Sequence, residues 1–231
     1  MKRRFDFLEY FPHFLYVVNK NHLSFGLLLS TISILLGYVI GSFPTAYVLL
    51  KWKVFQDIRT VGSGNVGAMN AYEVTGSKLM GIAVMLIDMV KGITAVGLTM
   101  LVFGSDGMLM SLCGLGTIAG HNFPVWLKFK GGRGLATTAG IMIVLGWLLL
   151  ASWCLLWTIS YLVSRHLHAA NIIATVLSPA IILLIPTEWV MITIPSFMNY
   201  NLYLSIVIAS SILIFLRHLD AIKAMRNSII Q

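Results

Sequence analysis

Long apolar runs separated by short polar segments make up most of this chain of 231 residues. A transmembrane helix needs about 20 mainly apolar residues to cross a bilayer, and seven runs approach or reach that length. They lie at residues 23–50, 79–103, 108–127, 135–148, 150–163, 171–186 and 202–216. The pattern therefore predicts an all-α, polytopic membrane protein with about seven transmembrane helices in a single domain, residues 23–231.

The fourth and fifth runs join into one apolar stretch from Leu135 to Val163. This stretch is too long for one untilted helix and too short for two full crossings. Two short helices can still cross a membrane where the bilayer thins locally. We therefore expect two helices here.

The first 22 residues differ from the rest, because acidic residues, a proline and a histidine interrupt the apolar positions that follow a basic start. About 14 residues, from Phe5 to Val18, are too few to span a bilayer. No small-residue cleavage site follows, so a signal peptide is not indicated. We expect residues 1–22 to form an interfacial extension on the membrane surface.

The composition supports the membrane assignment: 58% of the residues are hydrophobic and 10% are charged, against about a quarter charged in soluble domains. The net charge of +8 is divided among short loops, which is typical of cytoplasmic loops rather than of nucleic-acid binding. Most Lys and Arg residues lie at 51–78, 128–134, 165–168 and after 216, which predicts a cytoplasmic carboxyl end. The exceptions are Lys91, within the second apolar run, and Lys2, Arg3, Arg4 and Lys20.

A glycine-rich stretch, VGSGNVGAMN, follows the first apolar run. Backbone N–H groups of such a loop can converge on an anion, and the start of a helix adds its positive end. Arg59, just upstream, offers a guanidinium for phosphate oxygens. The alternative is a flexible loop, and no Walker A ending is present. The candidate ligands of the loop are Gly62, Ser63, Gly64, Asn65, Gly67 and Asn70.

A second stretch, GHNFPVWLKFKGGRGLAT, begins at Gly120 on the same predicted face. Two anion sites that face each other would suit two phosphorylated substrates. The alternatives are a basic collar that contacts lipid headgroups and, for the histidine, a structural role. The candidate residues here are His121, Asn122, Lys128, Lys130, Gly131, Gly132, Arg133 and Gly134.

Polar residues within the apolar runs are further candidates. Asp88 and Lys91 are three residues apart and share a helix face; they either neutralise each other or leave Lys91 to reach a phosphate. Ser42 lies beside Pro44, which would bend the first span. His218 follows Arg217 at the end of the last span, where cations are common. Cys113 and Cys154 show no disulfide or metal-binding spacing.

Together these stretches resemble the PlsY-type acyl-phosphate:glycerol-3-phosphate acyltransferases, bacterial membrane enzymes that make lysophosphatidic acid. Order and spacing agree from Gly41 to Lys223. The matching segments are GSFPTAY at Gly41, DIRTVGSGNVGAMN at Asp57, LIDMVKG at Leu86, GHNFPVWLKFKGGRGLAT at Gly120 and the Arg217–His218 pair.

The resemblance implies a seven-helix fold in the bacterial inner membrane, with the active site on the cytoplasmic face. It implies acyl phosphate and glycerol 3-phosphate as substrates, and neither coenzyme A nor a metal ion. Position by position, it makes the loop from Gly62 to Asn70 a phosphate cradle with Arg59 as its cationic wall. Lys128 or Lys130 would join Arg133 in a second anion contact, His121 and Asn122 would orient substrates, and His218 would orient the acceptor or accept its proton.

The chain departs from the family's pattern inside these motifs. KGGKG appears as KGGRG, with Arg133 in place of lysine, and a turn that usually reads S-L-x-S begins at His168 and ends at Asn171. Met69 replaces threonine, Glu73 stands where arginine is expected, and Ala221 replaces asparagine. The main alternative to the enzyme is therefore a weak or inactive homologue that binds phospholipid or a membrane partner. A transporter is a third reading, but the outer loops offer almost no polar residues.

Overall fold

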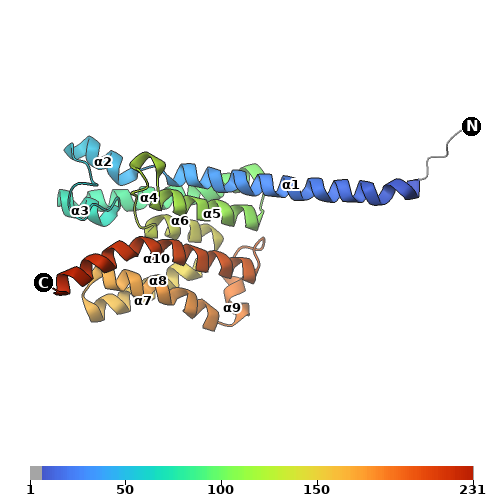
Figure 1. Ribbon diagram of the computed structural model, residues 1–231. Coiled ribbons are helices and arrows are strands. Elements are labelled where there is room, and N and C mark those ends of the chain that lie inside the picture. The colour runs from blue at the N-terminus through green and yellow to red at the C-terminus, as the bar shows by residue number, and fades with distance from the viewer. Residues whose placement is uncertain (1–6, 231) are drawn as a thin grey trace, which may run out of the picture.

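The computed structural model describes the backbone of residues 7–230 and the side chains of residues 24–219 and Ile222. Throughout this part of the chain the regular structure is helical (Figure 1). The elements are α1 Phe7–Gly41, α2 Thr45–Val54, α3 Ala68–Thr75, α4 Lys78–Phe103, α5 Gly107–Asn122, the 3-10 helix η1 Val125–Leu127, α6 Leu135–Leu145, α7 Leu148–Ser164, α8 Leu167–Leu184, α9 Thr187–Ile192 and α10 Tyr200–Ile230.

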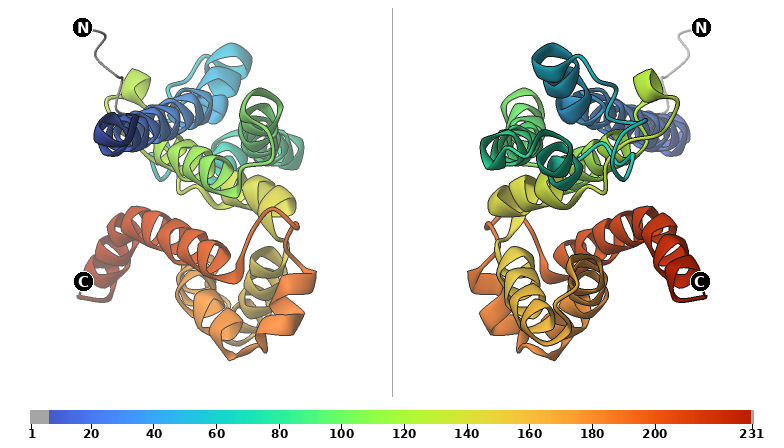
Figure 2. Two further views of the ribbon diagram at one scale, coloured as in Figure 1. Left: turned by 90° about the vertical axis from the view of Figure 1, so that its right-hand side faces the viewer. Right: turned by 90° about the vertical axis from the view of Figure 1, so that its left-hand side faces the viewer.

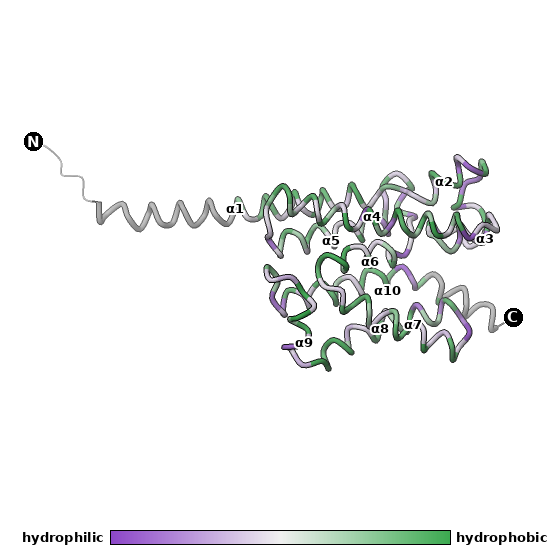
Figure 3. The backbone as a smooth tube through the Cα atoms, turned by 180° about the vertical axis from the view of Figure 1, so that it is seen from behind, coloured by the Kyte–Doolittle hydropathy of each residue, from purple (hydrophilic) through white to green (hydrophobic). Residues whose placement is uncertain are grey.

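The helices follow the apolar runs, which confirms the all-α membrane fold. Four segments of the described chain are long and apolar enough to cross a membrane: Ser24–Val54, Lys78–Phe103, Leu167–Leu184 and Tyr200–Leu219. Helices α5, α6 and α7 are shorter. Apolar residues cover most of the helix surfaces, and hydrophilic stretches gather at helix ends and loops such as that between α2 and α3 (Figure 3).

The first run contains a break that the sequence predicts only as a bend. Helix α1 ends at Gly41 and α2 begins at Thr45, with Pro44 at the position that precedes α2. Proline has no N–H to continue the α1 hydrogen-bond ladder. At the other end, the backbone is helical from Phe7 without interruption into the span. The interfacial location of residues 1–22 stays a prediction.

The expected division of the stretch from Leu135 to Val163 is confirmed, and Gly146 is the breaking point. Its φ of 148° is one that L side chains rarely adopt. The buried Tyr203 of α10 joins the two helix ends: the Leu149 N–H donates to its hydroxyl oxygen at 3.0 Å, and the hydroxyl donates to the Gly146 carbonyl at 3.2 Å. The break is therefore held by tertiary contacts.

The helices form two groups that lie side by side (Figure 2). In one group α1 packs against α5 and α4 against α6; in the other, α7 packs against α8. Helix α10 contacts both α5 and α8 and so joins the groups. Buried side chains of α5, α6 and α10, including Met110, Ile141 and Ile206, form the core at this junction.

Helices α1 and α5 approach closely because glycines face the backbone of the opposite helix. A Cβ atom on Gly37 or Gly41 would clash with the carbonyl of Cys113 or Thr117, and one on Gly116 or Gly120 would clash with that of Ile34 or Tyr38. Glycines spaced four residues apart are a common device for tight helix packing in membranes.

We expect Gly37→Ala to lower the free energy of unfolding by about 1–3 kcal/mol, because the added methyl group forces α1 away from α5. Thermal unfolding of the purified protein in detergent measures the effect. Gly26→Ala is the matched control on the same helix, since a Cβ there meets no atom within 4 Å. Equal melting temperatures for the two variants would contradict the packing argument.

Candidate active site

A cavity of about 540 Å³ lies between the two helix groups. At one end its lining is polar, with Asn65, His121, Arg133 and Asn171. Away from that end the lining residues are mainly apolar. They include Met85 and Met89 of α4, Ala139 and Met142 of α6, Leu149, Leu150, Trp153 and Cys154 of α7, and Ile214 of α10. The cavity therefore suits an amphiphilic ligand with a charged head and an apolar chain.

Two helices begin at the polar end. Gly67, Ala68 and Met69 at the start of α3 line the cavity, as do Gly134, Leu135 and Ala136 at the start of α6. Neither helix has a side-chain cap, and the N–H groups of a first turn have no partner within their own helix. Such N–H groups and the positive ends of the helix dipoles favour anions. Arg133, immediately before α6, adds a full positive charge.

The loop between α2 and α3 is shaped by Asn70. Its amide nitrogen donates to the carbonyls of Ile58, Val61 and Asn65 at 3.0–3.2 Å, and its oxygen accepts from the Ser63 N–H at 2.9 Å. Gly62, with φ 57°, passes so close that a Cβ would clash with the Asn70 oxygen. Asn70 is therefore a positioning residue for the loop.

Only part of the expected cradle faces the cavity. Asn65 and Gly67 line the cavity, whereas Gly62 and Ser63 are exposed on the protein surface outside it. The N–H groups of Ser63 and Gly64 are donated within the loop, to the oxygen atoms of Asn70 and Val61. The N–H groups of Ser63 and Gly64 are therefore already engaged, and the start of α3 is the part of this segment that lines the cavity.

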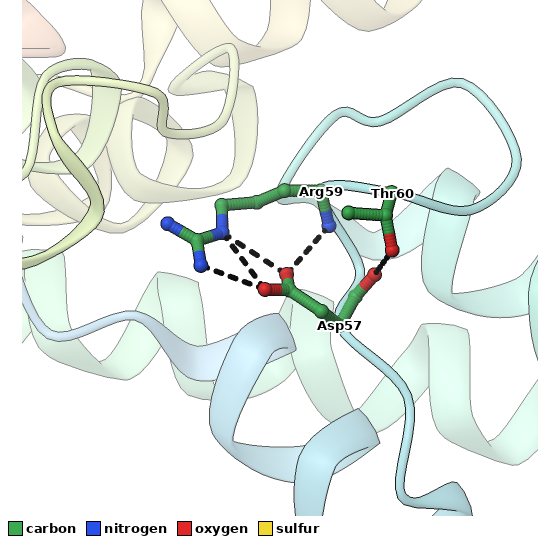
Figure 4. Close-up of polar contacts among 3 residues, drawn as sticks. All are labelled: Asp57, Arg59 and Thr60. Atoms are coloured by element: carbon green, nitrogen blue, oxygen red, sulfur yellow. Dashed lines mark hydrogen bonds and ion pairs between the residues drawn. The ribbon is translucent and has the colours of Figure 1, made fainter.

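Arg59 is held by its neighbour Asp57 (Figure 4). Its Nε and Nη2 donate to the carboxylate, the shortest distance being 2.7 Å, and its backbone N–H donates to the same group. The guanidinium also lies 5.2 Å from the centre of the Tyr47 ring. Arg59 is not among the residues that line the cavity. Its predicted role as a phosphate wall remains a prediction, and the geometry favours a role in the loop.

The same contact keeps the Asp57 carboxyl charged. Hydrogen bonds from the Arg59 side chain lower the pKa of Asp57 to about 2, and those bonds raise the pKa of Arg59. Because the folded pKa lies below the ordinary value of 3.8, the pair stabilises the loop above about pH 4. That contribution is lost as the pH falls from there through about 2.

We expect Asp57→Asn at pH 7 to loosen this loop, because it removes the charged acceptor that holds Arg59. Trypsin should then cleave after residue 59 faster than in the unmodified protein, as followed by mass spectrometry of the fragments. Cleavage after Lys78, beyond α3, serves as the internal reference. An unchanged ratio of the two cleavage rates would show that the ion pair does not hold the loop.

Lys91 is neutralised inside the helix bundle. Its ammonium group lies 2.8 Å from Asp88 Oδ1, donates to the Phe43 carbonyl at 3.2 Å and reaches His121 Nδ1 at 2.8 Å. Asp88 also accepts a bond from the Thr45 hydroxyl at 2.8 Å. An ammonium group has three protons to donate, so Lys91 has none left for a phosphate. Of the two alternatives for Lys91, the structure favours self-neutralisation.

The contact with Lys91 determines which ring nitrogen of His121 carries the proton. Since lysine only donates, His121 Nδ1 accepts, and the ring proton of a neutral histidine is then on Nε2. The residue is 8% exposed and lines the cavity. The Gly132 backbone passes beside Nε2, where a Cβ would clash. The Nε2–H group of this lining residue is the candidate hydrogen-bond donor for a ligand at the polar end of the cavity.

The loop from residue 128 to 134 differs from the expected second anion nest. The N–H groups of Gly131 and Gly132 donate to the carbonyls of Asn122 and His121 at 3.2 and 3.1 Å, so these two glycines do not offer N–H groups to a phosphate. Arg217 donates to the carbonyls of the same two glycines at 2.8 and 3.1 Å. These glycines instead attach the loop to the end of α5 and to the middle of α10.

Of the three basic residues in this loop, Arg133 alone lines the cavity. Lys128 and Lys130 are exposed on the surface outside it. For these two lysines the structure favours the alternative of a headgroup-contacting collar.

Three other predicted residues are buried but do not line the cavity: Ser42, Asn122 and His218. Asn122 donates to the Leu213 carbonyl at 2.9 Å and so ties α5 to α10. The His218 Nδ1 bonds to the Ile214 carbonyl at 2.9 Å, which leaves Nε2 buried without a partner in the described structure. The expected contact of His218 with the acceptor stays a prediction. Ala221 lies outside the described side chains.

The wall formed by α7 and α8 is the part of the site that the sequence did not reveal. Trp153 and Trp157 donate their indole N–H groups to Thr175 and Asn171 at 3.1 and 2.7 Å, and three of these side chains line the cavity. The two tryptophans are four residues apart, and so are their two acceptors. That spacing, with indole donors on one run and polar acceptors on the next, is the signal that marks this wall.

Comparison with known proteins shows the family to which the chain is similar. Residues 31–228 match the family model described as glycerol-3-phosphate acyltransferase. Glycerol-3-phosphate acyltransferase 2 of Thermotoga maritima is 40% identical over 144 residues, 62% of this chain and 72% of that protein. The glycerol-3-phosphate acyltransferase of Pelagibacter ubique is 32% identical over 190 residues, 82% of this chain and 90% of that protein.

Solved structures are similar as well. The crystal structure of PlsY (YgiH), an integral membrane glycerol 3-phosphate acyltransferase, in its glycerol 3-phosphate form has a TM-score of 0.71 and 29% identity, covering 86% of this chain and 92% of that one. Its lysophosphatidic acid form has a TM-score of 0.69 and 27% identity over the same shares.

Proposed function

The chain belongs to the glycerol-3-phosphate acyltransferase family, and on that premise we propose that it transfers a fatty acyl group from acyl phosphate to the 1-hydroxyl of glycerol 3-phosphate. The products are lysophosphatidic acid and inorganic phosphate. The protein is an integral membrane acyltransferase of phospholipid synthesis. The comparisons offer no support for the alternative of an inactive homologue.

One observation carries the proposal: two helix starts and Arg133 line one end of a cavity whose other walls are mainly apolar. The reaction needs places for two phosphates and one acyl chain at a common point. The starts of α3 and α6 supply positive ends of helix dipoles for the phosphates. From Gly134 to Met142 the lining of α6 extends about 12 Å at 1.5 Å per residue, which gives the acyl chain a path away from them.

The chemistry follows from this placement. Acyl phosphate is a mixed anhydride with a good leaving group, so positioning and charge stabilisation supply much of the rate. The glycerol hydroxyl oxygen attacks the acyl carbon, the bond from that carbon to the phosphate oxygen breaks, and no acyl-enzyme is needed. We propose that the His121 Nε2–H and the N–H groups at the start of α6 stabilise the negative charge that develops on the substrates.

The hydroxyl proton needs an acceptor, and the titratable groups at the polar end of the cavity are already engaged. Asp88 is paired with Lys91, His121 Nδ1 accepts from Lys91, and Arg133 is a permanent cation. His218 is buried away from the cavity. We therefore infer that a phosphate oxygen of a substrate takes the proton.

The proposed location is the inner membrane of a bacterium, with the polar end of the cavity on the cytoplasmic face. The support is the charge pattern: the loops that flank this end, residues 55–67 and 128–134, belong to the Lys- and Arg-rich set, and such loops are retained inside.

The test is phosphate release by the purified, membrane-reconstituted protein given palmitoyl phosphate, with and without glycerol 3-phosphate. We expect release that depends on the acceptor, with lysophosphatidic acid as the product, and no lysophosphatidic acid when palmitoyl coenzyme A replaces the acyl phosphate. Acyl transfer from coenzyme A alone would overturn the proposed donor. In native membranes, added glycerol 3-phosphate should be used by inside-out vesicles and not by right-side-out ones; the reverse would overturn the orientation.

A further inference from the structure

Two of the residues at which this chain departs from its family's pattern touch each other. Arg133, in place of lysine, and His168, in place of serine, are hydrogen-bonded with 3.0 Å between Arg133 Nη1 and His168 Nδ1. The bond crosses the boundary between the helix groups, because Arg133 precedes α6 and His168 lies in the first turn of α8. Both residues are partly buried.

The direction of this hydrogen bond is determined by chemistry. A guanidinium only donates, so His168 Nδ1 is the acceptor and its ring proton is on Nε2. The acceptor holds one nitrogen of a planar, rigid fork, and this restricts the orientation of the whole group. The same guanidinium lines the polar end of the cavity, so the contact sets the direction in which Arg133 faces a ligand.

Two other titratable groups act on the same imidazole. Glu73 of α3, a third departure from the family's pattern, interacts with His168 electrostatically, and so does His218 of α10. A serine hydroxyl here would be too short to span the same distance from the α8 backbone to a guanidinium.

We propose that His168 is the positioning residue for Arg133, and that the two substitutions compensate for each other. The inference rests on the proposed function, in which Arg133 binds a phosphate dianion. A lysine ammonium on its flexible stem is a point charge that needs no orienting partner, whereas an arginine fork binds phosphate well only in one plane. Arg133 thus binds phosphate well because His168 orients it, and replacement of either residue alone lowers activity.

A double-mutant cycle tests the pair. The variants are Arg133→Lys, His168→Ser and the two combined, which restores both residues of the family's pattern. We expect each single variant to lose about tenfold or more in kcat/KM, as for a hydrogen bond to a charged group, and the double variant to return to within a few-fold of the unmodified enzyme. His166→Ser, an exposed histidine on the same turn, should leave turnover unchanged.

The kinetic constants identify which phosphate Arg133 holds. A KM increase confined to glycerol 3-phosphate in His168→Ser assigns Arg133 to the acceptor, and one confined to palmitoyl phosphate assigns it to the donor. His168→Asn, which keeps a short acceptor group, should retain more activity than His168→Ala. A loss in the double variant equal to the product of the two single losses would overturn the proposal, as would unmodified turnover in His168→Ala.

Ligand binding tests the Arg133–His168 pair even if the proposed activity is absent. If the unmodified protein releases no phosphate from palmitoyl phosphate, glycerol 3-phosphate binding still tests the pair through the melting temperature in detergent. We expect the ligand to raise the melting temperature of the unmodified protein and of the double variant more than that of either single variant. Equal shifts in all four proteins would overturn the proposal.

Discussion

Replacement of Arg133 by alanine should lower kcat/KM for acyl transfer by about a hundredfold or more. Arg133 is the cation at the polar end of the cavity, beside the uncapped start of α6. A preorganised donor at developing charge contributes about that much in enzymes that transfer acyl groups. Steady-state rates of phosphate release, with glycerol 3-phosphate and palmitoyl phosphate varied in turn, measure the loss.

The matched control is Arg165→Ala. Arg165 is exposed at the end of α7 on the same predicted membrane face and does not line the cavity. The same charge is removed, so any general effect of charge on the recruitment of anionic substrates appears in both variants. If Arg133→Ala and Arg165→Ala lost activity equally, the cavity would not be the site of phosphate binding.

The second large effect concerns the acyl chain. Ala139 lines the apolar part of the cavity on α6, and Ala139→Phe should lower kcat/KM for palmitoyl phosphate by at least about tenfold, since one or a few methylenes are worth that much in a filled apolar pocket. Octanoyl phosphate, with half as many carbons, should lose less. The ratio of kcat/KM for the two donors reports the change independently of the amount of active enzyme.

Ile143→Phe is the control for this variant, because Ile143 lies on the same helix, is 48% exposed and is not part of the lining. It should leave the donor ratio unchanged. A donor ratio in Ala139→Phe that matches the unmodified enzyme would show that the chain does not follow the cavity along α6.

Much of the fold follows from the sequence, because hydropathy is an average over a long segment and needs no knowledge of partners. The apolar runs correspond to α1 with α2, α4, α5, α6, α7, α8 and α10. The split near Gly146 was predictable for the same reason, since length alone excludes a single helix. The region of the site was also predictable, because glycine-rich loops stand directly before α3 and α6.

The roles of individual residues could not be predicted, because they depend on contacts between distant segments. Arg59 is engaged by Asp57, and Lys91 is saturated by groups that include the Phe43 carbonyl and His121. Spacing shows that a lysine and an aspartate share a helix face, but it does not show which other acceptors the folded chain brings to them.

The sequence by itself therefore establishes a multi-helix membrane protein with two glycine-rich, basic motifs on one face. Only the tertiary structure decides that Arg133 faces the cavity while Lys128 and Lys130 face outward, and that His168 of a later helix holds Arg133. The physical reason is that burial in a membrane is a property of whole segments, whereas the direction of a side chain depends on the partners that packing supplies.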